Sequence, residues 1–243
     1  GDAKLVSYFT PYHKPLVHKT FEAPSVRKAD KKYGKIVSIV MIAKNIQYHV
    51  CHAIMSCINQ TYPNLQIIVV EDGSKDNTLE KCMSMATFDS RIEVYSQKLG
   101  ANGARRFGME KAIGDYCLMV DGDDWLTNDA IERLVGVAEQ NRSECVVFGY
   151  DHYNDKNRIF HNPIFPSGKS IDAAPVWSAR TIAEAQNASY LNHTVWVLFF
   201  SLKLKDMVLK SLISLEMYED LPMLVTMFQS ARNPIIYNFI LYH

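Results

Sequence analysis

Three carboxylates stand close together near the middle of the chain, at Asp121, Asp123 and Asp124, directly after the apolar run YCLMV. Two carboxylates that are one residue apart in a turn can converge on one divalent cation, because hard cations prefer oxygen ligands. Gly122 is expected to let the backbone bend between them. The alternative is a solvated turn in which Asp124 or Thr127 caps the following helix. The pattern alone indicates either a cation site or a capped turn.

Two other polar segments follow apolar runs. Asp72, in EDGS, could accept hydrogen bonds from a nucleotide base or ribose, or it could form an Asx turn before a helix. The segment GANGARR, residues 100–106, could bring backbone N–H groups and a guanidinium to a diphosphate at a helix N-terminus. Solvated arginines are the alternative. Neither segment identifies a ligand by itself.

Two acidic residues and two histidines further along the chain are also candidates for the functional site. Glu219 and Asp220 open a helical pattern, where the helix dipole favours acidic residues, so they are either first-turn residues or a catalytic base. His193 and His243 could approach the acidic turn in three dimensions. The residue types alone do not decide whether Glu219 and Asp220 include a catalytic base, or whether either histidine reaches the acidic turn.

The elements that must position these residues follow a repeating pattern. Apolar runs of strand length alternate with helical patterns of about 10 to 15 residues. Continuous apolar strands of this kind are typical of a parallel sheet covered by helices on both faces. Asn45 is expected to cap the first helix, and Thr127 or Asn128 a later one. The strands are expected at 36–43, 65–70, 91–95, 115–120 and 144–150.

Beyond residue 150 the pattern weakens. A polar, proline-containing segment occupies residues 151–177, and one more apolar strand is expected at 195–200. Further helices are expected at 179–188, 204–213 and 219–231.

The loops that follow the first four strands are where a ligand site is expected, because ligands of open α/β sheets bind outside the carboxyl ends of the strands. In chain order these loops contain AKN, EDGS, KLGANGARR and DGDDW. Two of them are acidic, and one carries adjacent arginines.

The composition is that of a globular protein without a charge bias. Of 243 residues, 48% are hydrophobic, and 26 Lys and Arg balance 26 Asp and Glu, which removes the general electrostatic argument for nucleic acid as a partner. The five cysteines lack CxxC spacing, which indicates buried thiols in a reducing, cytoplasmic compartment. No apolar stretch approaches the roughly 18 residues of a transmembrane helix. Peripheral association with the inner face of the membrane is compatible with this composition.

Four consecutive segments closely resemble the family 2 glycosyltransferases of bacterial type: VSIVMIAKN, SCINQTYPNLQIIVVEDGSKDNTLE, GANGARRFGMEKAIGDY and LMVDGDDWLTNDAIERLV. They cover residues 36–138. Further on, YEDLPMLVTMF and PIIYNFILYH resemble the Glu-Asp helix and the closing strand of many bacterial members. The resemblance implies an α/β fold of the GT-A type: a Rossmann-like, mostly parallel sheet with helices on both faces and an irregular C-terminal acceptor-side region.

The implied domain organisation is an N-terminal extension or linker at residues 1–34 and one GT-A domain at 35–243. Within that domain, residues 35–140 are the expected nucleotide-sugar-binding half and residues 141–243 the expected acceptor-binding half.

The resemblance also implies roles for individual residues. Asp72 matches the position that hydrogen-bonds the base, and Asn102 and Arg105 fall in the loop that helps to hold the nucleotide. Asp121 and Asp123 form the DxD motif. Asp121 is expected near the ribose or the metal, and Asp123 is the expected metal ligand.

Asp220 matches the general base, with Glu219 beside it. The chain departs from the family pattern at three positions: Ile42 replaces a common proline or threonine, Lys44 stands where tyrosine is usual, and Arg106 replaces an asparagine. Ile42 and Lys44 are still expected to contact the donor, although contacts from this first loop should differ from the family pattern.

The implied function is a metal-dependent, inverting hexosyl- or N-acetylhexosaminyl-transferase that uses Mn²⁺ or Mg²⁺. The donor would be a nucleotide-diphosphate sugar, most often UDP-linked, and the acceptor a saccharide, lipid-linked or polymer hydroxyl in cell-surface polysaccharide synthesis. One alternative is a sugar-nucleotide nucleotidyltransferase, although its glycine-rich basic loop is missing after the first strand. Another is a non-catalytic nucleotide-sugar-binding module of a longer polymerase.

Overall fold

Four apolar runs form the parallel half of one sheet. The computed structural model describes residues 29–153, 159–162, 176–178, 197–212, 227 and 229–243. In it β1 (Val37–Ala43) lies between β2 (Leu65–Asp72) and β4 (Tyr116–Asp121), and β3 (Ile92–Gln97) pairs with the other side of β2. β1 and β2 are buried along almost their whole length, as expected for strands covered on both faces.

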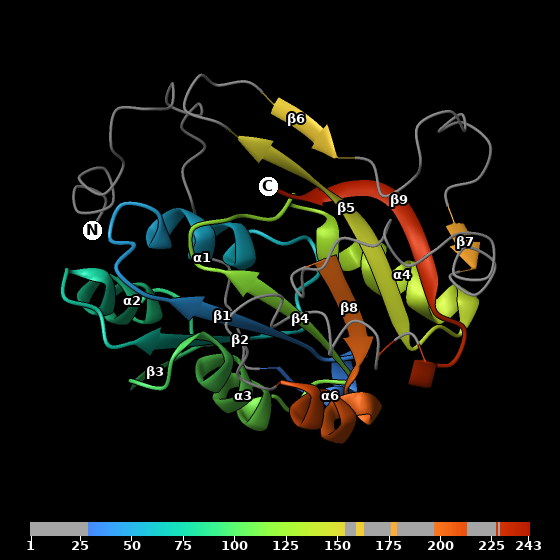
Figure 1. The fold of residues 1–243 in the computed structure, drawn as a ribbon, viewed down its shortest axis with the longest axis horizontal. Coiled ribbons are helices and arrows are strands. Elements are labelled where there is room, and N and C mark those ends of the chain that lie inside the picture. Colours follow the sequence, from blue (N-terminus) through green and yellow to red (C-terminus); the bar gives the residue numbers. More distant parts are fainter. Residues whose placement is uncertain (1–28, 154–158, 163–175, 179–196, 213–226, 228) are drawn as a thin grey trace.

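Helices alternate with these strands and cover the sheet. α1 (Val50–Ile58) packs on α2 (Thr78–Ala86), and α3 (Ala101–Lys111) packs on β1 and β2. Right-handed βαβ connections place α1 and α2 on the face opposite α3. Figure 1 shows α3 beside the short helix α6 (Lys205–Ser211). The expectation of a mostly parallel sheet with helices on both faces is confirmed.

The other half of the sheet is built by chain segments that are distant in sequence. β8 (Leu198–Ser201) lies antiparallel between β4 and β5 (Cys145–Tyr153), and β9 (Ile235–Tyr242) runs parallel to β5. β7 (Val176–Ser178) adds to β9, and β6 (Ile159–Asn162) pairs with β5. Among the described residues the order is β3-β2-β1-β4-β8-β5-β9-β7, with β6 beside β5.

Most expected elements occur with shifted ends. The second strand extends two residues further than its apolar run, so that Asp72 is its last residue, and the expected helix at 204–213 is η6 (Leu202–Leu204) followed by α6. The helix expected at 179–188 lies outside the described residues. Of the helix expected at 219–231, residues 227, 229 and 230 are described and helical.

The segment before β1 is anchored where it is described. After a short 3-10 helix, η3 (Lys31–Tyr33), the side chain of Asn64 donates hydrogen bonds to the carbonyl oxygens of Asp30, Gly34 and Lys35. On the C-terminal side of β4, α4 (Ala130–Asn141) packs on β5 and β9. No helix in the described part of the chain is long and apolar enough to cross a membrane.

Two expected helix caps are wrong. α1 begins after His49, and Asn45 lies in the preceding loop with φ 54°, where its Oδ1 accepts a hydrogen bond from the Lys75 amide at 2.8 Å. α4 begins after Asp129 without a side-chain cap, and the Thr127 hydroxyl donates to Asp129 Oδ1 at 3.3 Å. For Asn45, a tertiary hydrogen bond therefore replaces the local cap that the residue type favoured.

A glycine in α3 sets how closely this helix approaches the sheet. A Cβ at Gly108 would lie 2.4 Å from Val40 Cγ1 and 3.2 Å from Val70 Cγ2. We expect Gly108→Ala to lower the free energy of unfolding by about 1–3 kcal/mol, because the helix must move away from β1 and β2. Gly136 in α4 has nothing within 4 Å of an added Cβ. Gly136→Ala should therefore leave stability unchanged or raise it by up to about 1 kcal/mol. Denaturant unfolding measures both, and equal shifts for the two variants would contradict the packing argument.

Candidate active site

The acidic turn after β4 is fixed against the end of β1. The amide of Gly122 donates a hydrogen bond to the Ile42 carbonyl oxygen at 2.9 Å. A Cβ at Gly122 would lie 2.6 Å from Ile46 Cδ1 and 2.7 Å from that same carbonyl oxygen. Gly122 is not among the described glycines with positive φ. The backbone turns at Gly122, where the Asp124 amide donates to the Asp121 carbonyl oxygen, but without a positive φ, so the glycine is required for close approach to β1.

Arg105 lies behind the first carboxylate of the turn. Its Nη2 atom is 3.2 Å from Asp121 Oδ1, and its Nη1 atom is 3.4 Å from Asn102 Oδ1. The Arg105 side chain is 7% exposed, whereas that of Asp121 is 27% exposed. Because α3 carries both Asn102 and Arg105, this helix directs a buried positive charge at the DxD motif.

The third carboxylate has a partner on the last strand. The hydroxyl of Tyr242 donates to Asp124 Oδ2 at 2.8 Å and accepts from the Asp121 amide at 2.9 Å. Tyr242 is buried at 1% exposure. Burial raises the pKa of Asp124 to about 7, the Tyr242 hydrogen bond opposes this rise, and the charges of Asp123 and Asp121 add to it. Of the alternatives for Asp124, a helix cap is not what the structure shows: α4 begins after Asp129 without a side-chain cap, and Asp124 joins β9 to the acidic turn.

The end of the chain continues this contact. The backbones of Trp125 and His243 exchange hydrogen bonds of 2.9 and 2.8 Å, and their rings stack with centroids 5.7 Å apart. His243 therefore lies against the acidic turn, on the indole of Trp125. His193 lies outside the described residues. Within those residues, no group of three or more His, Cys, Asp or Glu side chains could hold a metal ion.

The loops after β1 and β2 are hydrogen-bonded to each other. The amide of Asn45 donates to Ser74 Oγ at 3.0 Å, and the amide of Ile46 donates to Thr78 Oγ1 at 2.9 Å. The Gln47 amide donates to an Asp76 carboxylate oxygen at 3.1 Å. These hydrogen bonds fix the loop after β1 against the chain that follows β2. Lys44 and Asp72, which directly precede the bonded segments, are thereby held near each other.

Asp72, at the end of β2, accepts three hydrogen bonds. Its Oδ2 atom accepts from Lys44 Nζ at 2.9 Å, and its Oδ1 atom accepts from the amides of Leu99 and Gly100. Gly100 has φ 76°, in the left-handed region that glycine adopts readily. Burial by itself would raise the pKa of Asp72, but the hydrogen bonds from Lys44, Leu99 and Gly100 outweigh it and lower the pKa. Asp72 is therefore held as a carboxylate.

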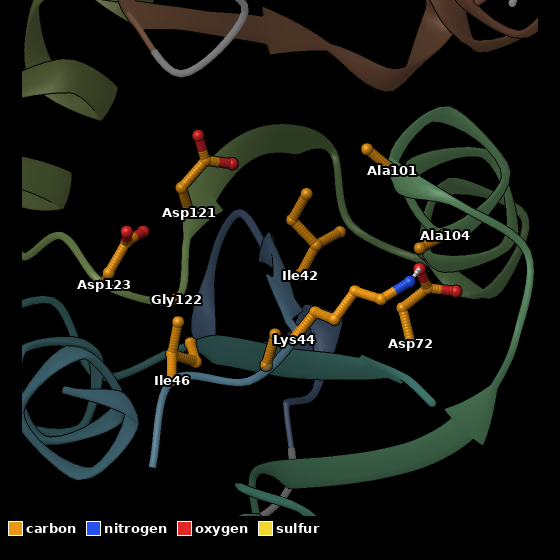
Figure 2. A pocket seen from close by; sticks show the side chains of 10 residues that line it. Ile42, Lys44, Ile46, Asp72, Ala101, Ala104, Asp121, Gly122 and Asp123 are labelled. Carbon is orange, nitrogen blue, oxygen red and sulfur yellow. Dashed lines mark hydrogen bonds and ion pairs between the residues drawn. The ribbon is translucent and has the colours of Figure 1, made fainter. Parts of the chain in front are cut away.

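These side chains surround a pocket of about 240 Å³ at the carboxyl ends of β1, β2 and β4. Figure 2 shows the Lys44 side chain extended to Asp72 on one side, with Asp121 and Asp123 on the other. Asp123 is exposed at the pocket. The lining consists of Ile42, Ala43, Lys44, Ile46, Asp72, Ala101, Ala104, Asp121, Gly122 and Asp123.

Five of the expected site residues line this pocket, and two others lie behind it. Asn102 and Arg105 are buried beside Asp121 and do not line the cavity. Glu219 and Asp220 lie outside the described residues. Sequence reasoning missed Tyr242, because no spacing in the chain indicates that the last strand ends beside the acidic turn. The five lining residues among those expected are Ile42, Lys44, Asp72, Asp121 and Asp123.

The sheet order and the acidic pocket define a Rossmann-like α/β fold of the GT-A type. The family model described as glycosyl transferase family 2 matches residues 38–205, more than half of the chain. The chain belongs to this family.

Three similar curated proteins come from bacteria. An uncharacterized glycosyltransferase of Haemophilus influenzae is 34% identical over 108 residues, 44% of this chain and 43% of that protein. The uncharacterized glycosyltransferase EpsJ of Bacillus subtilis is 33% identical over 129 residues, 53% of this chain and 38% of that protein. Glycosyltransferase GlyA of Streptococcus pneumoniae is 30% identical over 126 residues, 51% of this chain and 18% of that protein. The matched segments span less than half of each relative.

The fold is shared with S. aureus TarS. One TarS structure superposes with a TM-score of 0.65 and 17% identity, covering 86% of this chain and 36% of that chain. The complex of TarS with UDP-GlcNAc gives a TM-score of 0.64 and 17% identity, over 86% of this chain and 57% of that chain.

The raised pKa of Asp124 predicts how stability depends on pH. Because the folded-state pKa of about 7 lies above the ordinary value of 3.8, the folded protein binds more protons than the unfolded chain between these values. The contribution of Asp124 to stability is therefore present at low pH and is lost as the pH rises through about 7. We expect Asp124→Asn to make the free energy of unfolding of the metal-free protein less dependent on pH, by up to about 1.4 kcal/mol per pH unit.

Denaturant unfolding of the wild type and Asp124→Asn across this pH range measures the difference. Tyr242→Phe is the matched variant. It removes the hydrogen bond that opposes the rise in the Asp124 pKa, so the loss of stability should extend to higher pH. Identical pH slopes for wild type and Asp124→Asn would contradict the assignment.

Proposed function

We propose that this domain is a divalent-cation-dependent, inverting glycosyltransferase. It would transfer a hexosyl or N-acetylhexosaminyl group from a UDP-linked donor to a hydroxyl of a saccharide, lipid-linked or polymer acceptor in cell-surface polysaccharide synthesis. One observation carries the proposal: in a chain of family 2, Asp72, Asp121 and Asp123 line one pocket at the carboxyl ends of β2 and β4.

The two sides of the pocket suit the two ends of a nucleotide diphosphate. On one side, Asp72 and Lys44 offer a hydrogen-bond acceptor and a donor to a base. On the other, Asp121 and Asp123 suit a cation that accompanies a diphosphate. TarS, which shares the fold, has been captured with UDP and with UDP-GlcNAc, which supports a UDP-linked donor here.

The residues present fit Mn²⁺ or Mg²⁺. Asp121 and Asp123 supply carboxylate oxygens at the pocket, and Asp123 is exposed to it. Such cations in phosphate-handling sites are commonly held by one or two carboxylates, with substrate phosphates and water completing the shell. A bound cation would neutralise the charge that develops on the leaving diphosphate.

Side chains of the protein would position the cation ligand and remove the proton from the acceptor. Arg105 holds Asp121 by a charge-assisted hydrogen bond, so that the carboxylate is oriented before substrate arrives. Asp220 would take the proton of the acceptor hydroxyl as its oxygen bonds to the anomeric carbon. The bond from that carbon to the diphosphate oxygen breaks at the same time, and the nucleoside diphosphate leaves with the electron pair. Attack from the opposite face gives inversion.

The proposal places the reaction in a reducing, cytoplasmic compartment. All five cysteines are free thiols, and four of them are buried. Association with the inner face of the membrane would bring the domain to a lipid-linked acceptor.

Removing the exposed carboxylate tests the cation site. We expect Asp123→Ala to reduce the release of UDP from a UDP-sugar by at least about 100-fold, because the cation that would neutralise the leaving diphosphate loses its exposed carboxylate ligand. The stabilisation that Mn²⁺ and nucleotide give in thermal unfolding should disappear as well. Asp206→Ala changes an exposed carboxylate in α6, outside the pocket lining, and should behave as wild type. Wild-type turnover by Asp123→Ala would refute the assignment.

The general base is tested separately. We expect Asp220→Asn to bind donor and Mn²⁺ normally but to lose about 100-fold to 10,000-fold in transfer, because proton removal is affected and binding is not. The measurement pairs donor calorimetry with a transfer assay. Glu219→Gln is the neighbouring control and should retain more activity. A larger loss in Glu219→Gln than in Asp220→Asn would contradict the assignment.

A further inference from the structure

The carboxylate of Asp72 is largely committed before any ligand binds. A carboxylate offers about four lone-pair positions, and Asp72 uses two on Oδ1 for the amides of Leu99 and Gly100. A third, on Oδ2, accepts from Lys44 Nζ at 2.9 Å. The Asp72 side chain is only 4% exposed. One acceptor position therefore remains for a ligand, on the oxygen that Lys44 contacts.

Lys44 supplies the complementary group at the same point. Its ammonium has three N–H donors and gives one to Asp72, so donors remain for a ligand beside the carboxylate. The Lys44 side chain is 50% exposed and lines the pocket. Figure 2 shows it pointing to Asp72 and away from Asp121 and Asp123. Lys44 thus acts at the end of the pocket opposite the DxD motif.

The loop that carries Lys44 is held in place. The neighbouring Asn45 both donates to Ser74 Oγ at 3.0 Å and accepts from the Lys75 amide at 2.8 Å. Asp72 is held by two amides, of Leu99 and Gly100, that directly precede α3. The acceptor and the donor are therefore presented side by side at a nearly fixed separation, as a paired contact to a flat ring edge requires.

We propose that Lys44 is a base-selecting residue, which donates to a ring carbonyl while Asp72 accepts from the adjacent ring N–H. Uracil presents this edge as its N3–H next to its C4 carbonyl. Cytosine in the same position would turn the N3 lone pair toward the carboxylate and its C4 amino group toward the ammonium, and both contacts are repulsive. The inference rests on the proposed function, because it assigns the base of the nucleotide-diphosphate donor.

Binding of matched nucleotides tests this proposal. Isothermal titration with UDP and CDP, in the presence of Mn²⁺, compares two ligands that share the sugar and diphosphate and differ in the base edge. We expect the wild type to prefer UDP by about tenfold or more, since one base contact involves a charged donor. Lys44→Met should reduce this preference to about threefold or less, and Lys44→Arg, which keeps a donor, should retain most of it.

Two controls separate the alternatives. Lys75→Met removes an exposed lysine from the neighbouring loop, outside the pocket lining, and should keep the wild-type preference. UMP and CMP carry one phosphate fewer, and the effect of Lys44→Met should persist with them. If Lys44→Met weakens UDP and CDP equally, Lys44 acts on the phosphates or the fold, and the inference is wrong. If it keeps the full UDP preference, the inference is also wrong while the proposed function stands. If the wild type binds neither nucleotide, the proposed function fails and the inference fails with it.

Discussion

The close approach of the acidic turn to β1 is the constraint on which the rest of the site depends. The register pairs Asp121 with Ile42, and one residue later the amide of Gly122 reaches the Ile42 carbonyl oxygen at a point where a Cβ would collide with it. This contact brings the end of β4 beside the loop that carries Lys44. Asp72 reaches the same place because β2 is the other neighbour of β1. The pocket therefore follows from strand order together with one residue that has no side chain.

Gathering carboxylates at one edge costs free energy unless each charge is compensated, and the structure compensates them differently. Asp72 is paired with Lys44 and two amides, and Asp121 faces the buried Arg105. Asp124 accepts from Tyr242, and burial raises its pKa to about 7. Asp123 is the carboxylate exposed at the pocket. Asp123 is thus the carboxylate suited to a cation, whereas Asp121 and Asp124 are held by Arg105 and Tyr242.

The parallel half of the fold was predictable because its signals are local. Continuous apolar runs such as the one that forms β2 show that a strand is buried on both faces, and the chain order of strands and helices restricts the topology to few arrangements. The C-terminal half was not predictable in this way. β8 is four residues long and inserts antiparallel between β4 and β5, which are far from it in sequence. The expected cap at Asn45 failed for the same reason, since its side chain bonds to the Lys75 amide, 30 residues away in the loop after β2.

The sequence by itself placed Asp72, Asp121 and Asp123 at or shortly after the ends of apolar runs, and it indicated the family to which the chain belongs, because residue type and spacing along the chain are enough for both. Only the tertiary structure decided the partner of each charge. The hydrogen bond of Tyr242 to Asp124 joins residues 118 positions apart, and that of Lys44 to Asp72 joins residues 28 apart. Such pairs depend on the register of the strands and the closure of the loops, which no local pattern encodes.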